Sequence, residues 1–544
     1  MDKLISETIG YCLKERAEKT PGIIGLSYRD YSYSWREIDE ISDFLAVKYL
    51  KYGIKKGTHV GIWSVNTPNW VFAYFALVKL GAIAILINTC YKETELEKIL
   101  KYSDVEYIFY GNGIKDLNYK DILDKINISN LPKLKNTFPL EKNDDIKWYR
   151  RSDYPSDMPV DDCKKLIQAI NQVNAKDTAS IMFTSGTTKS QKGVLLSHYN
   201  LVNNSLSISR QMGWNEQDKI CVAVRLFHCF GITAGILSAV HSGSCIHLIK
   251  YYKTCEVLNQ IEKYKCTVLN GVPTMFMAIV RNSKLKDHDI SSVKSGIIAG
   301  SAIHSEEYIN ICKILNLKYL QPSYGQTETS PCITISALND SIEKKAVSVG
   351  KSIDNVEVKI WNCKENRESK EGELGEILTR GYHVMKGYYK MPLETDEVID
   401  STGWLHTGDL GFIDKEGYLY VKGRIKEIII RGGENISPVE IEYYIKKLPS
   451  IKEVKVIGVE AEVLQEEIVA CVVPKENCEV SKEEVQAIVS KYLTAYKVPK
   501  YVLVFDQLPT TSSGKIKLGK LKKIVEERIN NKEEYICILQ NNMT

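Results

Sequence analysis

Short apolar runs separated by helix-patterned segments recur along the first half of the chain, and they constrain its fold more than any other feature. They occupy His59–Val65, Val105–Gly111, Thr178–Thr184, Lys219–Val224, Ser244–Ile249 and Cys266–Pro273. Runs of this length without polar alternation are typical of strands that helices bury on both faces. The alternation therefore predicts an α/β fold built on sheets covered by helices.

The longest apolar stretch, Val71–Ile87, has the composition of a membrane span but a better local explanation. It is short for a bilayer, and Lys79 and Gly81 interrupt it. Thr67 is a suitable N-cap, Pro68 suits the first helical position, and Gly81 suits a helix end. The stretch is thus predicted to be a helix followed by a buried strand, and no integral membrane segment is expected.

The chain is long enough to require more than one domain. Its 544 residues exceed the size at which one hydrophobic core keeps growing. After about Ser348 the sequence changes to glycine-punctuated strand signals, which predict a smaller β-rich part. Past Arg424 a helix pattern, a strand pattern and a Lys/Glu-rich tail follow, and they indicate a separate small α+β domain.

The charge balance and the cysteines exclude several function classes. Lys and Arg number 72 against 68 Asp and Glu, a net charge of +4, which argues against a dedicated nucleic-acid binder or a strongly basic membrane-surface protein. The 14 cysteines include no C-x-x-C pair and no cluster with histidine at ligand spacing, so a zinc site is not expected. Scattered thiols of this kind indicate a protein of the reducing cytosol. The N-terminal segment lacks the apolar core of a signal peptide, which also favours a cytoplasmic protein.

A donor-rich stretch, Thr184–Val194 (TSGTTKSQKGV), is the first candidate site. Its hydroxyls, glycines and lysines suit a polyphosphate, although a solvated Ser/Thr turn has the same composition. A strand pattern precedes it and the residues from Gly193 onward have a helical pattern, so we expect it at the carboxyl end of a strand, where open α/β sheets bind ligands. It is not a Walker loop, because Gln191 and Gly193 stand where that motif requires other residues.

Further motifs follow in a fixed order, and together they carry a resemblance to a known family. They are LFHCFG (Leu226–Gly231), IIAGSAI (Ile297–Ile303), YGQTE (Tyr324–Glu328), GWLHTGD (Gly403–Asp409), GRIKEIIIRGGENISPVEIE (Gly423–Glu440) and LPTTSSGKI (Leu508–Ile516). With the donor-rich loop, they resemble the acyl- and aryl-CoA synthetases of the adenylate-forming superfamily, which also contains luciferases and peptide-synthetase adenylation domains. The resemblance runs from about residue 20 to about residue 525.

The resemblance implies an architecture and a reaction. It implies a large adenylation domain over residues 1–425, made of mixed sheets covered by helices with a small β-rich subdomain, and a small mobile α+β lid over residues 427–544, with Lys426 as the hinge. It implies that a carboxylic acid reacts with ATP to give acyl-AMP and pyrophosphate, and that the thiol of coenzyme A then displaces AMP. ATP, Mg²⁺ and coenzyme A are the implied ligands.

The same resemblance assigns a nucleotide site residue by residue. Glu328, on its own a typical surface acid, would hold Mg²⁺, a hard cation that prefers carboxylate and phosphate oxygens, and Thr327 would bond the α-phosphate. Asp409 suits the ribose hydroxyls because a carboxylate only accepts hydrogen bonds, and Arg424 would reach the ribose or a phosphate. The remaining nucleotide ligands would be Thr184, Ser185, Gly186, Thr187, Thr188, Lys189, Ser190, Gln191 and Lys192 at the phosphates, Gly300, Ser301 and Ala302 against the adenine, and Ser323, Tyr324 and Gly325 on its other side.

His228, Lys515 and two glycines complete the implied machinery. A lone histidine between phenylalanines is usually a core residue, but in this family the position meets the carboxylate end of the acid, where amino-acid-activating relatives carry an aspartate. A histidine at 228 therefore favours an acid without an α-amino group. Lys515 would act on the α-phosphate and the carboxylate as a point charge in a first pose of the lid. Gly432 and Gly433 would line the pantetheine channel in a second pose.

Departures from the family pattern keep other functions open. The family has glycine where Lys189 stands and proline where Gln191 and Arg225 stand. A catalytically weak acyl-adenylate or nucleotide sensor is therefore one alternative, and an enzyme that loads the phosphopantetheine of a carrier protein is another. The apolar acyl-site motif favours a fatty acid over an aryl acid, while acyl chain length and oligomeric state stay open.

Overall fold

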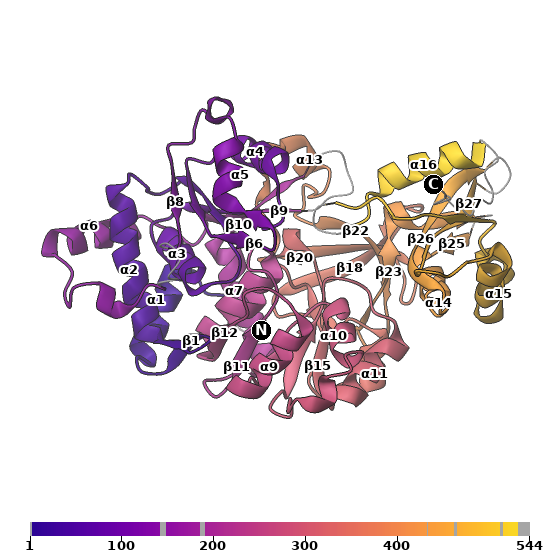
Figure 1. Cartoon of the computed structure of the whole chain (residues 1–544), viewed down its shortest axis with the longest axis horizontal. Coiled ribbons are helices and arrows are strands. Elements are labelled where there is room, and N and C mark those ends of the chain that lie inside the picture. Colours follow the sequence, from indigo (N-terminus) through magenta and orange to yellow (C-terminus); the bar gives the residue numbers. More distant parts are fainter. Residues whose placement is uncertain are drawn as a thin grey trace, which may run out of the picture.

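The computed structural model describes residues 3–141, 148–184, 191–431, 434–461, 465–511 and 515–530. Figure 1 shows a large body of sheets and helices, coloured indigo to light orange, and a smaller body at the C-terminal end of the described chain, coloured orange to yellow. The architecture confirms the predicted α/β class, with helices packed against the sheets of the large body and a small α+β unit after them.

The first large sheet is nine-stranded, and the strands from β15 to β1 run parallel. Its order is β17 (Lys351–Ser352), β16 (Thr334–Ile335), β15 (Tyr319–Tyr324), β14 (Ser295–Ile298), β13 (Val268–Leu269), β11 (Lys219–Val222), β12 (Cys245–Leu248), β1 (Ile24–Tyr28) and β2 (Tyr31–Ser34). One face packs against α9 (Thr254–Tyr264), α10 (Pro273–Val280) and α11 (Ser305–Leu315), whose apolar residues form a core cluster with those of the parallel strands.

The second large sheet is seven-stranded and shares a helical layer with the first. Its order is β21 (Gly387–Tyr388), β10 (Gly193–Ser197), β9 (Thr178–Phe183), β4 (Ile83–Leu86), β3 (His59–Trp63), β5 (Tyr107–Tyr110) and β8 (Asn136–Pro139), and its outer face packs against α4 (Glu93–Tyr102) and α5 (Tyr119–Lys125). The core cluster that joins both sheets includes α1 (Ile9–Lys19), α2 (Trp35–Lys51), α3 (Pro68–Lys79), α7 (His198–Met212), the π-helix Gly231–Leu237 and α8 (Ser238–Ser242).

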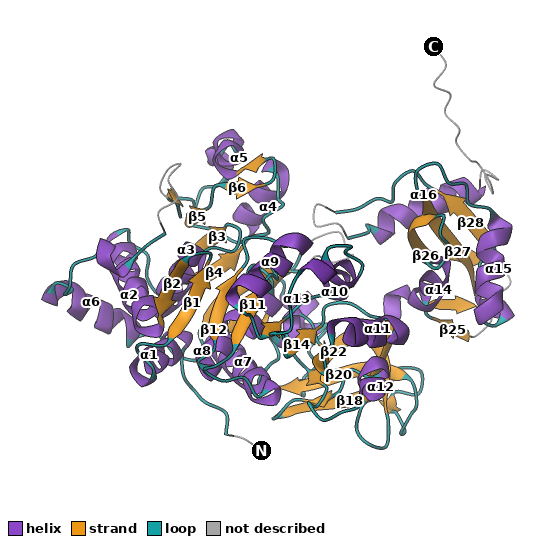
Figure 2. Cartoon of the chain, turned by 60° about the horizontal axis from the view of Figure 1, so that its bottom comes forward, coloured by secondary structure: helices purple, strands orange, loops and turns teal. Residues whose placement is uncertain are grey.

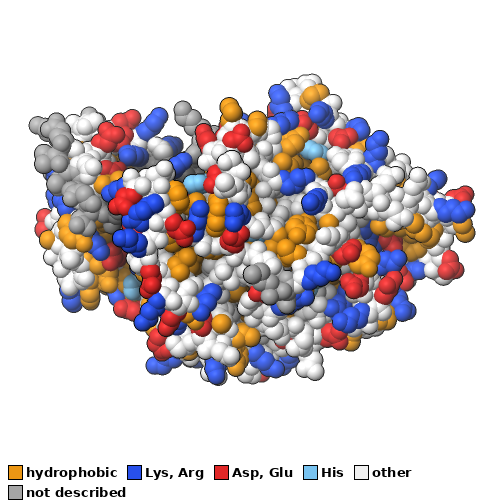
Figure 3. Space-filling model, turned by 180° about the vertical axis from the view of Figure 1, so that it is seen from behind, with side chains coloured by type: hydrophobic (Ala, Val, Ile, Leu, Met, Phe, Trp, Pro, Cys, Tyr) orange, Lys and Arg blue, Asp and Glu red, His pale blue; other side chains and the backbone are white. Residues whose placement is uncertain are grey.

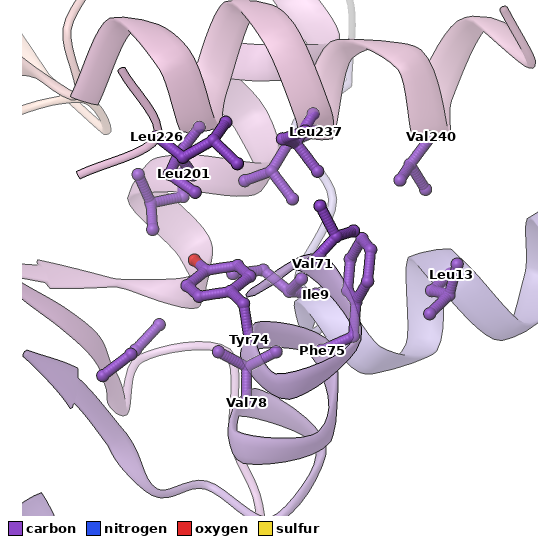
Figure 4. Close-up of a cluster of buried hydrophobic side chains, with 14 of the residues drawn as sticks. Ile9, Leu13, Val71, Tyr74, Phe75, Val78, Leu201, Leu226, Leu237 and Val240 are labelled. Carbon is purple, nitrogen blue, oxygen red and sulfur yellow. The ribbon is translucent and has the colours of Figure 1, made fainter. Parts of the chain in front are cut away.

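Helix α3 accounts for the long apolar stretch of the sequence. Thr67 caps it, Pro68 begins it, and every residue from 68 to 79 is buried, because the helix lies inside the core shared by the two sheets. Figure 4 shows its side chains among those of α1, α7 and α8, with Val71, Tyr74, Phe75 and Val78 labelled. Within the described ranges the structure contains no helix, α3 included, with the length and hydropathy that crossing a bilayer requires.

Lys79, the charge that interrupts the apolar stretch, is held by a buried ion pair. Its Nζ lies 2.6 Å from Oδ1 of Asp39 and 2.6 Å from Oδ1 of Asp43, both on α2, and the side chain is 3% exposed. Burial works against the charge of the lysine, yet the two carboxylates raise its pKa above the usual value. Lys79, the last residue of α3, therefore anchors the end of this helix to α2.

One prediction of secondary structure is wrong. The residues from Gly193 onward were expected to be helical, but Gly193–Ser197 forms β10, which pairs antiparallel with β9, and α7 begins only at His198. Ser197 ends the strand and caps the helix through a capping box with Asn200. The donor-rich stretch thus connects two antiparallel strands instead of a strand and a helix.

The rest of the chain forms the predicted β-rich part and the small C-terminal unit. The first is a five-stranded sheet, β19 (Arg367–Glu368), β18 (Val356–Asn362), β20 (Gly375–Gly381), β22 (Leu405–Ile413) and β23 (Leu419–Arg424). The small unit has a sheet in the strand order β25 (Glu434–Ile436), β24 (Ile429–Arg431), β27 (Gln465–Pro474) and β26 (Ile451–Ala461), with β28 (Tyr501–Val504) paired to β27. Three helices pack on this sheet: α14 (Pro438–Ile445), α15 (Lys482–Tyr492) and α16 (Leu518–Asn530). Shorter elements are α6 (Val160–Ile170), α12 (Ile342–Val347), α13 (Pro392–Asp396), the hairpin of β6 (Gly113–Ile114) and β7 (Leu117–Asn118), and 3₁₀ turns at Ile128–Asn130, Arg151–Asp153, Leu285–Asp287 and Ala495–Lys497.

The surface carries charges of both signs. Figure 3 shows basic and acidic side chains interspersed with apolar ones over the described part of one face of the molecule. This mixture agrees with the small net charge of +4.

Replacing Lys79 by methionine is expected to lower the free energy of unfolding by about 3 kcal/mol, because removing one partner leaves buried carboxylates uncompensated. Denaturant unfolding measures this change. The matched triple variant Lys79→Met, Asp39→Asn, Asp43→Asn removes the uncompensated charges and should recover most of the loss. An unchanged stability in the single variant would show that the ion pair does not anchor α3.

Candidate active site

The donor-rich stretch connects β9 and β10, which lie beside the edge strand β21 of the second sheet. Its ends are joined by a hydrogen bond from the backbone nitrogen of Thr184 to the carbonyl of Lys192, at 3.1 Å. Gln191 is half-buried and hydrogen-bonds Tyr91. The expected phosphate ligands Ser185, Gly186, Thr187, Thr188, Lys189 and Ser190 lie outside the described residues.

Lys192, Tyr388 and Glu328 form a chain of contacts at this edge. The Nζ of Lys192 lies 4.4 Å from the centre of the Tyr388 ring, and the Tyr388 hydroxyl donates to Oε1 of Glu328 at 2.9 Å. Glu328 itself lies on the 3₁₀ turn Thr327–Thr329. The nitrogen of Met385, which precedes β21, donates to the Glu328 carbonyl at 2.9 Å and holds this turn in place. The structure thus brings the predicted phosphate lysine next to the predicted metal carboxylate, with Tyr388 between them.

Asp409, Tyr324 and Arg424 form a second group. The Tyr324 hydroxyl donates to Oδ2 of Asp409 at 2.7 Å, and Nε of Arg424 lies 3.2 Å from Oδ1. The strand register explains the ion pair, because Asp409 on β22 stands directly opposite Arg424 on β23. Burial raises the pKa of the Asp409 carboxyl, and the Arg424 charge and the tyrosine bond oppose that rise. The predicted ribose ligand is therefore a buried, oriented acceptor.

The loop expected against adenine follows β14. Gly300 has φ +88, a left-handed conformation that favours glycine, and Gly300, Ser301 and Ala302 are all exposed. Ser323 donates to the carbonyl of Thr334 at 2.9 Å. At Gly325 a Cβ would lie 1.8 Å from the carbonyl oxygen of Pro331, so this position admits no side chain.

The His228 segment is fixed by a buried amide that the sequence reading did not single out. The Nδ2 of Asn66 donates to the carbonyls of Val224 at 2.9 Å and Ile249 at 3.1 Å, and its Oδ1 accepts from the nitrogen of Leu226 at 3.1 Å. Asn66 follows β3 in the second sheet, whereas its partners follow β11 and β12 in the first. One side chain thereby fastens the loop that carries His228 to both sheets.

His228 is held as a neutral imidazole. Its side chain is exposed at the mouth of the site, yet the protein atoms packed around it and the positive charges of Arg225 and Lys515 lower its pKa to about 4. Burial and the charge of Arg424 also lower the pKa of Lys515, while Glu328 opposes that shift. The electrostatic influence among these groups places Lys515, from the small unit, near groups of the large body.

The structure brings some of the predicted site residues together and leaves others apart. The structure brings together Lys192, Glu328, Asp409, Arg424 and Lys515 with His228 and Tyr324. Lys426 lies exposed on the 3₁₀ turn Ile425–Glu427 between β23 and β24, where the chain passes into the small unit. Gly432 and Gly433 lie outside the described residues.

The arrangement suits a bound polyphosphate with one divalent cation. Cationic Lys192, Arg424 and Lys515 face the same region as the carboxylate of Glu328. The described residues contain no group of three or more His, Cys, Asp or Glu side chains that could hold a metal by themselves. A single carboxylate is nevertheless a sufficient protein ligand for Mg²⁺, because phosphate oxygens and water supply the remaining positions.

Comparisons with known proteins agree with this geometry. The AMP-binding enzyme family model matches residues 13–389, and the model of the AMP-binding enzyme C-terminal domain matches residues 440–515. The putative acyl-CoA synthetase YngI of Bacillus subtilis is 35% identical, covering 97% of this chain and 99% of that protein. The human mitochondrial medium-chain acyl-CoA ligase ACSF2 is 32% identical, covering 97% of this chain and 89% of that protein.

Solved structures show the same fold. The anthranilate CoA ligase AuaEII in complex with anthranoyl-AMP superposes with a TM-score of 0.82 at 22% identity, covering 97% of this chain and 99% of that one. The o-succinylbenzoate CoA synthetase MenE of Bacillus subtilis, in complex with ATP and magnesium, gives 0.79 at 27% identity, covering 95% of this chain and 100% of that one. The likeness extends over nearly the whole chain.

His228 is expected to stay neutral at pH 6, where a free imidazole is mostly protonated. Because Arg225 and Lys515 each lower its pKa, Arg225→Gln and Lys515→Ala should each move its titration upward. Histidine-selective NMR measures both effects. His383 is the internal control, since burial alone lowers its pKa to about 3 and the same substitutions should leave it unchanged. A His228 titration near pH 6.5 in the wild type would contradict the described environment.

Proposed function

Because the chain belongs to the AMP-binding enzyme family, we propose that it activates a fatty acid as its acyl-adenylate and transfers the acyl group to coenzyme A. The family and the acyl-CoA ligase relatives identify an AMP-forming acid–CoA ligase. The fatty-acid substrate and the roles of single residues are the proposed part. The observation that carries the residue roles is the approach of Lys515 to the region of Glu328, Arg424 and His228.

The first half-reaction brings two anions together, which is its main electrostatic difficulty. A carboxylate oxygen forms a bond to the α-phosphorus of ATP, and the bond to the departing pyrophosphate breaks. Lys515 and Arg424 would stabilise the charge at the α-phosphate, and Lys192 the charge on the leaving group, because preorganised cations act most strongly where charge develops. Mg²⁺ held by Glu328 would neutralise phosphate charge. Asp409 would orient the ribose as an acceptor.

A neutral His228 fits the acid side of this reaction. A protonated imidazole would compete with the lysine for the carboxylate, whereas a neutral ring can donate or accept one hydrogen bond without drawing the nucleophile away. Its lowered pKa, about 4, keeps the ring neutral at physiological pH.

The residues after His228 favour an apolar acyl group. Gly231–Leu237 forms a π-helix whose residues are all buried and mostly apolar. π-helical turns frequently occur at functional sites, where they displace the backbone from a regular helix. Relatives named medium-chain acyl-CoA ligases make medium-chain fatty acids the first candidates, ahead of aryl acids.

In the second half-reaction the thiol of coenzyme A attacks the acyl carbon, the bond to AMP breaks, and the thiol proton is released. The phosphopantetheine of a carrier protein carries the same thiol, so it is the competing acceptor. A nucleotide sensor would bind the ligands without either step. These alternatives differ in their products and not in the nucleotide site.

The deciding experiment measures acid-dependent exchange of pyrophosphate into ATP and then identifies the thioester. Fatty acids from short to long and a set of benzoates are each assayed with Mg²⁺ and with either coenzyme A or a holo-carrier protein. We expect exchange that depends on a fatty acid, and acyl-CoA with AMP as products. Exchange with benzoates alone would contradict the substrate, thioester only on the carrier would contradict the acceptor, and absence of exchange would favour the sensor.

Lys515→Ala is expected to slow the first half-reaction about a hundredfold or more, because a charge-assisted contact to the reacting phosphate is lost. Thioester formation from supplied acyl-AMP should survive. Lys517→Ala, which changes an exposed lysine two positions along the same segment, is the matched control and should affect neither step. Equal loss of both steps in Lys515→Ala would refute the assignment of this lysine to adenylation.

Lys192→Ala should weaken adenylation by removing a cation from the pyrophosphate side, and Lys192→Arg should retain more activity because it keeps the charge. Thermal unfolding should be nearly unchanged in both, since the lysine contacts the face of a tyrosine ring and no buried acid. Pyrophosphate exchange at varied ATP concentration is the readout. Wild-type rates in Lys192→Ala would remove this residue from the site.

A further inference from the structure

We propose that helix α14 and the start of α11 form a docking contact that positions Lys515 for the first half-reaction. The contact consists of His304 and Glu306 on the large body and Tyr443 and Lys447 on the small unit. The inference rests on the proposed function, because it concerns how the lysine is delivered to that site. These are positioning residues, since none of them is placed at the reacting atoms.

Three direct interactions define the docking contact. The His304 imidazole and the Tyr443 ring are stacked, with centroids 3.4 Å apart and planes 6° apart. The Tyr443 hydroxyl donates to Oε2 of Glu306 at 2.6 Å, and Nζ of Lys447 lies 3.1 Å from the same oxygen. Figures 1 and 2 both show α11 and α14 facing each other where the large body meets the small one. The stack and the ion pair thus fix both the distance and the rotation of α14.

The burial of His304 distinguishes this contact from a chance surface approach. Its Nδ1 is buried without a hydrogen-bond partner among the described residues. Burial lowers the pKa of the imidazole, and the Glu306 carboxylate opposes that shift. A ring that gives up hydration of one nitrogen needs a compensating interaction, and stacking on Tyr443 supplies it.

The position of the contact links it to the candidate active site. His304 is the N-cap residue of α11, and it follows the exposed turn at Gly300, Ser301 and Ala302, which is the expected adenine wall. The small unit therefore meets the large body at the edge of the nucleotide site, while its Lys515 comes within electrostatic reach of Glu328. Docking at α11 restricts the orientations available to the unit and raises the effective concentration of the lysine at the reacting groups.

The contact should matter in only one half-reaction. If the small unit turns to present a different surface for thioester formation, the His304–Tyr443 stack and the Glu306 bonds must break. An interaction present in only one of two states shifts the equilibrium toward that state. Loss of the docking contact is therefore expected to slow adenylation and to leave thioester formation from supplied acyl-AMP unchanged or faster.

The test measures both half-reactions in the full-length protein. Tyr443→Ala should reduce the rate of acid-dependent pyrophosphate exchange about tenfold, and Tyr443→Phe, which keeps the stack and loses the hydroxyl bond, should reduce it less. Lys447→Met should also reduce it. Its matched control is Lys491→Met. Both lysines lie over the Tyr492 ring, Lys491 at 5.2 Å and Lys447 at 5.3 Å from its centre, but Lys447 is the one that pairs with Glu306.

A second readout does not depend on catalysis. Small-angle scattering of the Tyr443→Ala, Lys447→Met double variant should give a larger radius of gyration than the wild type and the Lys491→Met control. Equal loss of both half-reactions, or unchanged exchange rates and unchanged scattering in the double variant, would overturn the proposal. A wild type that lacks pyrophosphate exchange would refute the proposed function instead, and the scattering comparison would still decide whether the contact docks the unit.

Discussion

The buried amide of Asn66 is the interaction on which the geometry of the candidate site depends. Asn66 comes directly after β3 of the second sheet. Its side chain hydrogen-bonds the backbone of Val224, Leu226 and Ile249, which come after β11 and β12 of the first sheet. Without it, buried carbonyl and amide groups at the junction of the sheets would lack partners, which is costly in a protein interior. The loop that carries His228 is therefore held to both sheets by one side chain.

The other residues of the candidate site are charged side chains and the tyrosines that contact them. Lys192, Arg424 and Lys515 provide positive charge, and Glu328 and Asp409 are oriented by the hydroxyls of Tyr388 and Tyr324. Burial, Arg225 and Lys515 lower the pKa of His228. Two tyrosines thus orient the carboxylates, while the lysines and the arginine supply the positive charge of the site. Lys515 comes from the small unit, so the proposed adenylation depends on how that unit sits against the large body.

Local signals in the sequence predicted much of this structure. The cap at Thr67 and the proline at 68 predicted the start of α3, and the six apolar runs located β3, β5, β9, β11, β12 and β13. Periodicity could not distinguish the short strand Gly193–Ser197 from the first turn of α7, because five residues carry too little pattern and the pairing with β9 is decided by tertiary structure. The motifs pointed to Lys192, Glu328 and Asp409, but the partners that orient or dock them, Tyr388, Asn66 and the His304–Tyr443 pair, join residues far apart in the sequence. A single sequence gives no local signal for such pairs.

The formation of an acyl-adenylate is the central claim, and oxygen transfer tests it most directly. A fatty acid labelled with ¹⁸O in both carboxylate oxygens is converted with unlabelled ATP and coenzyme A, and the AMP and the thioester are analysed by mass spectrometry. Attack of the carboxylate on the α-phosphorus predicts one ¹⁸O in AMP and one in the thioester carbonyl. Label in inorganic phosphate or pyrophosphate, or AMP without label, would contradict the account.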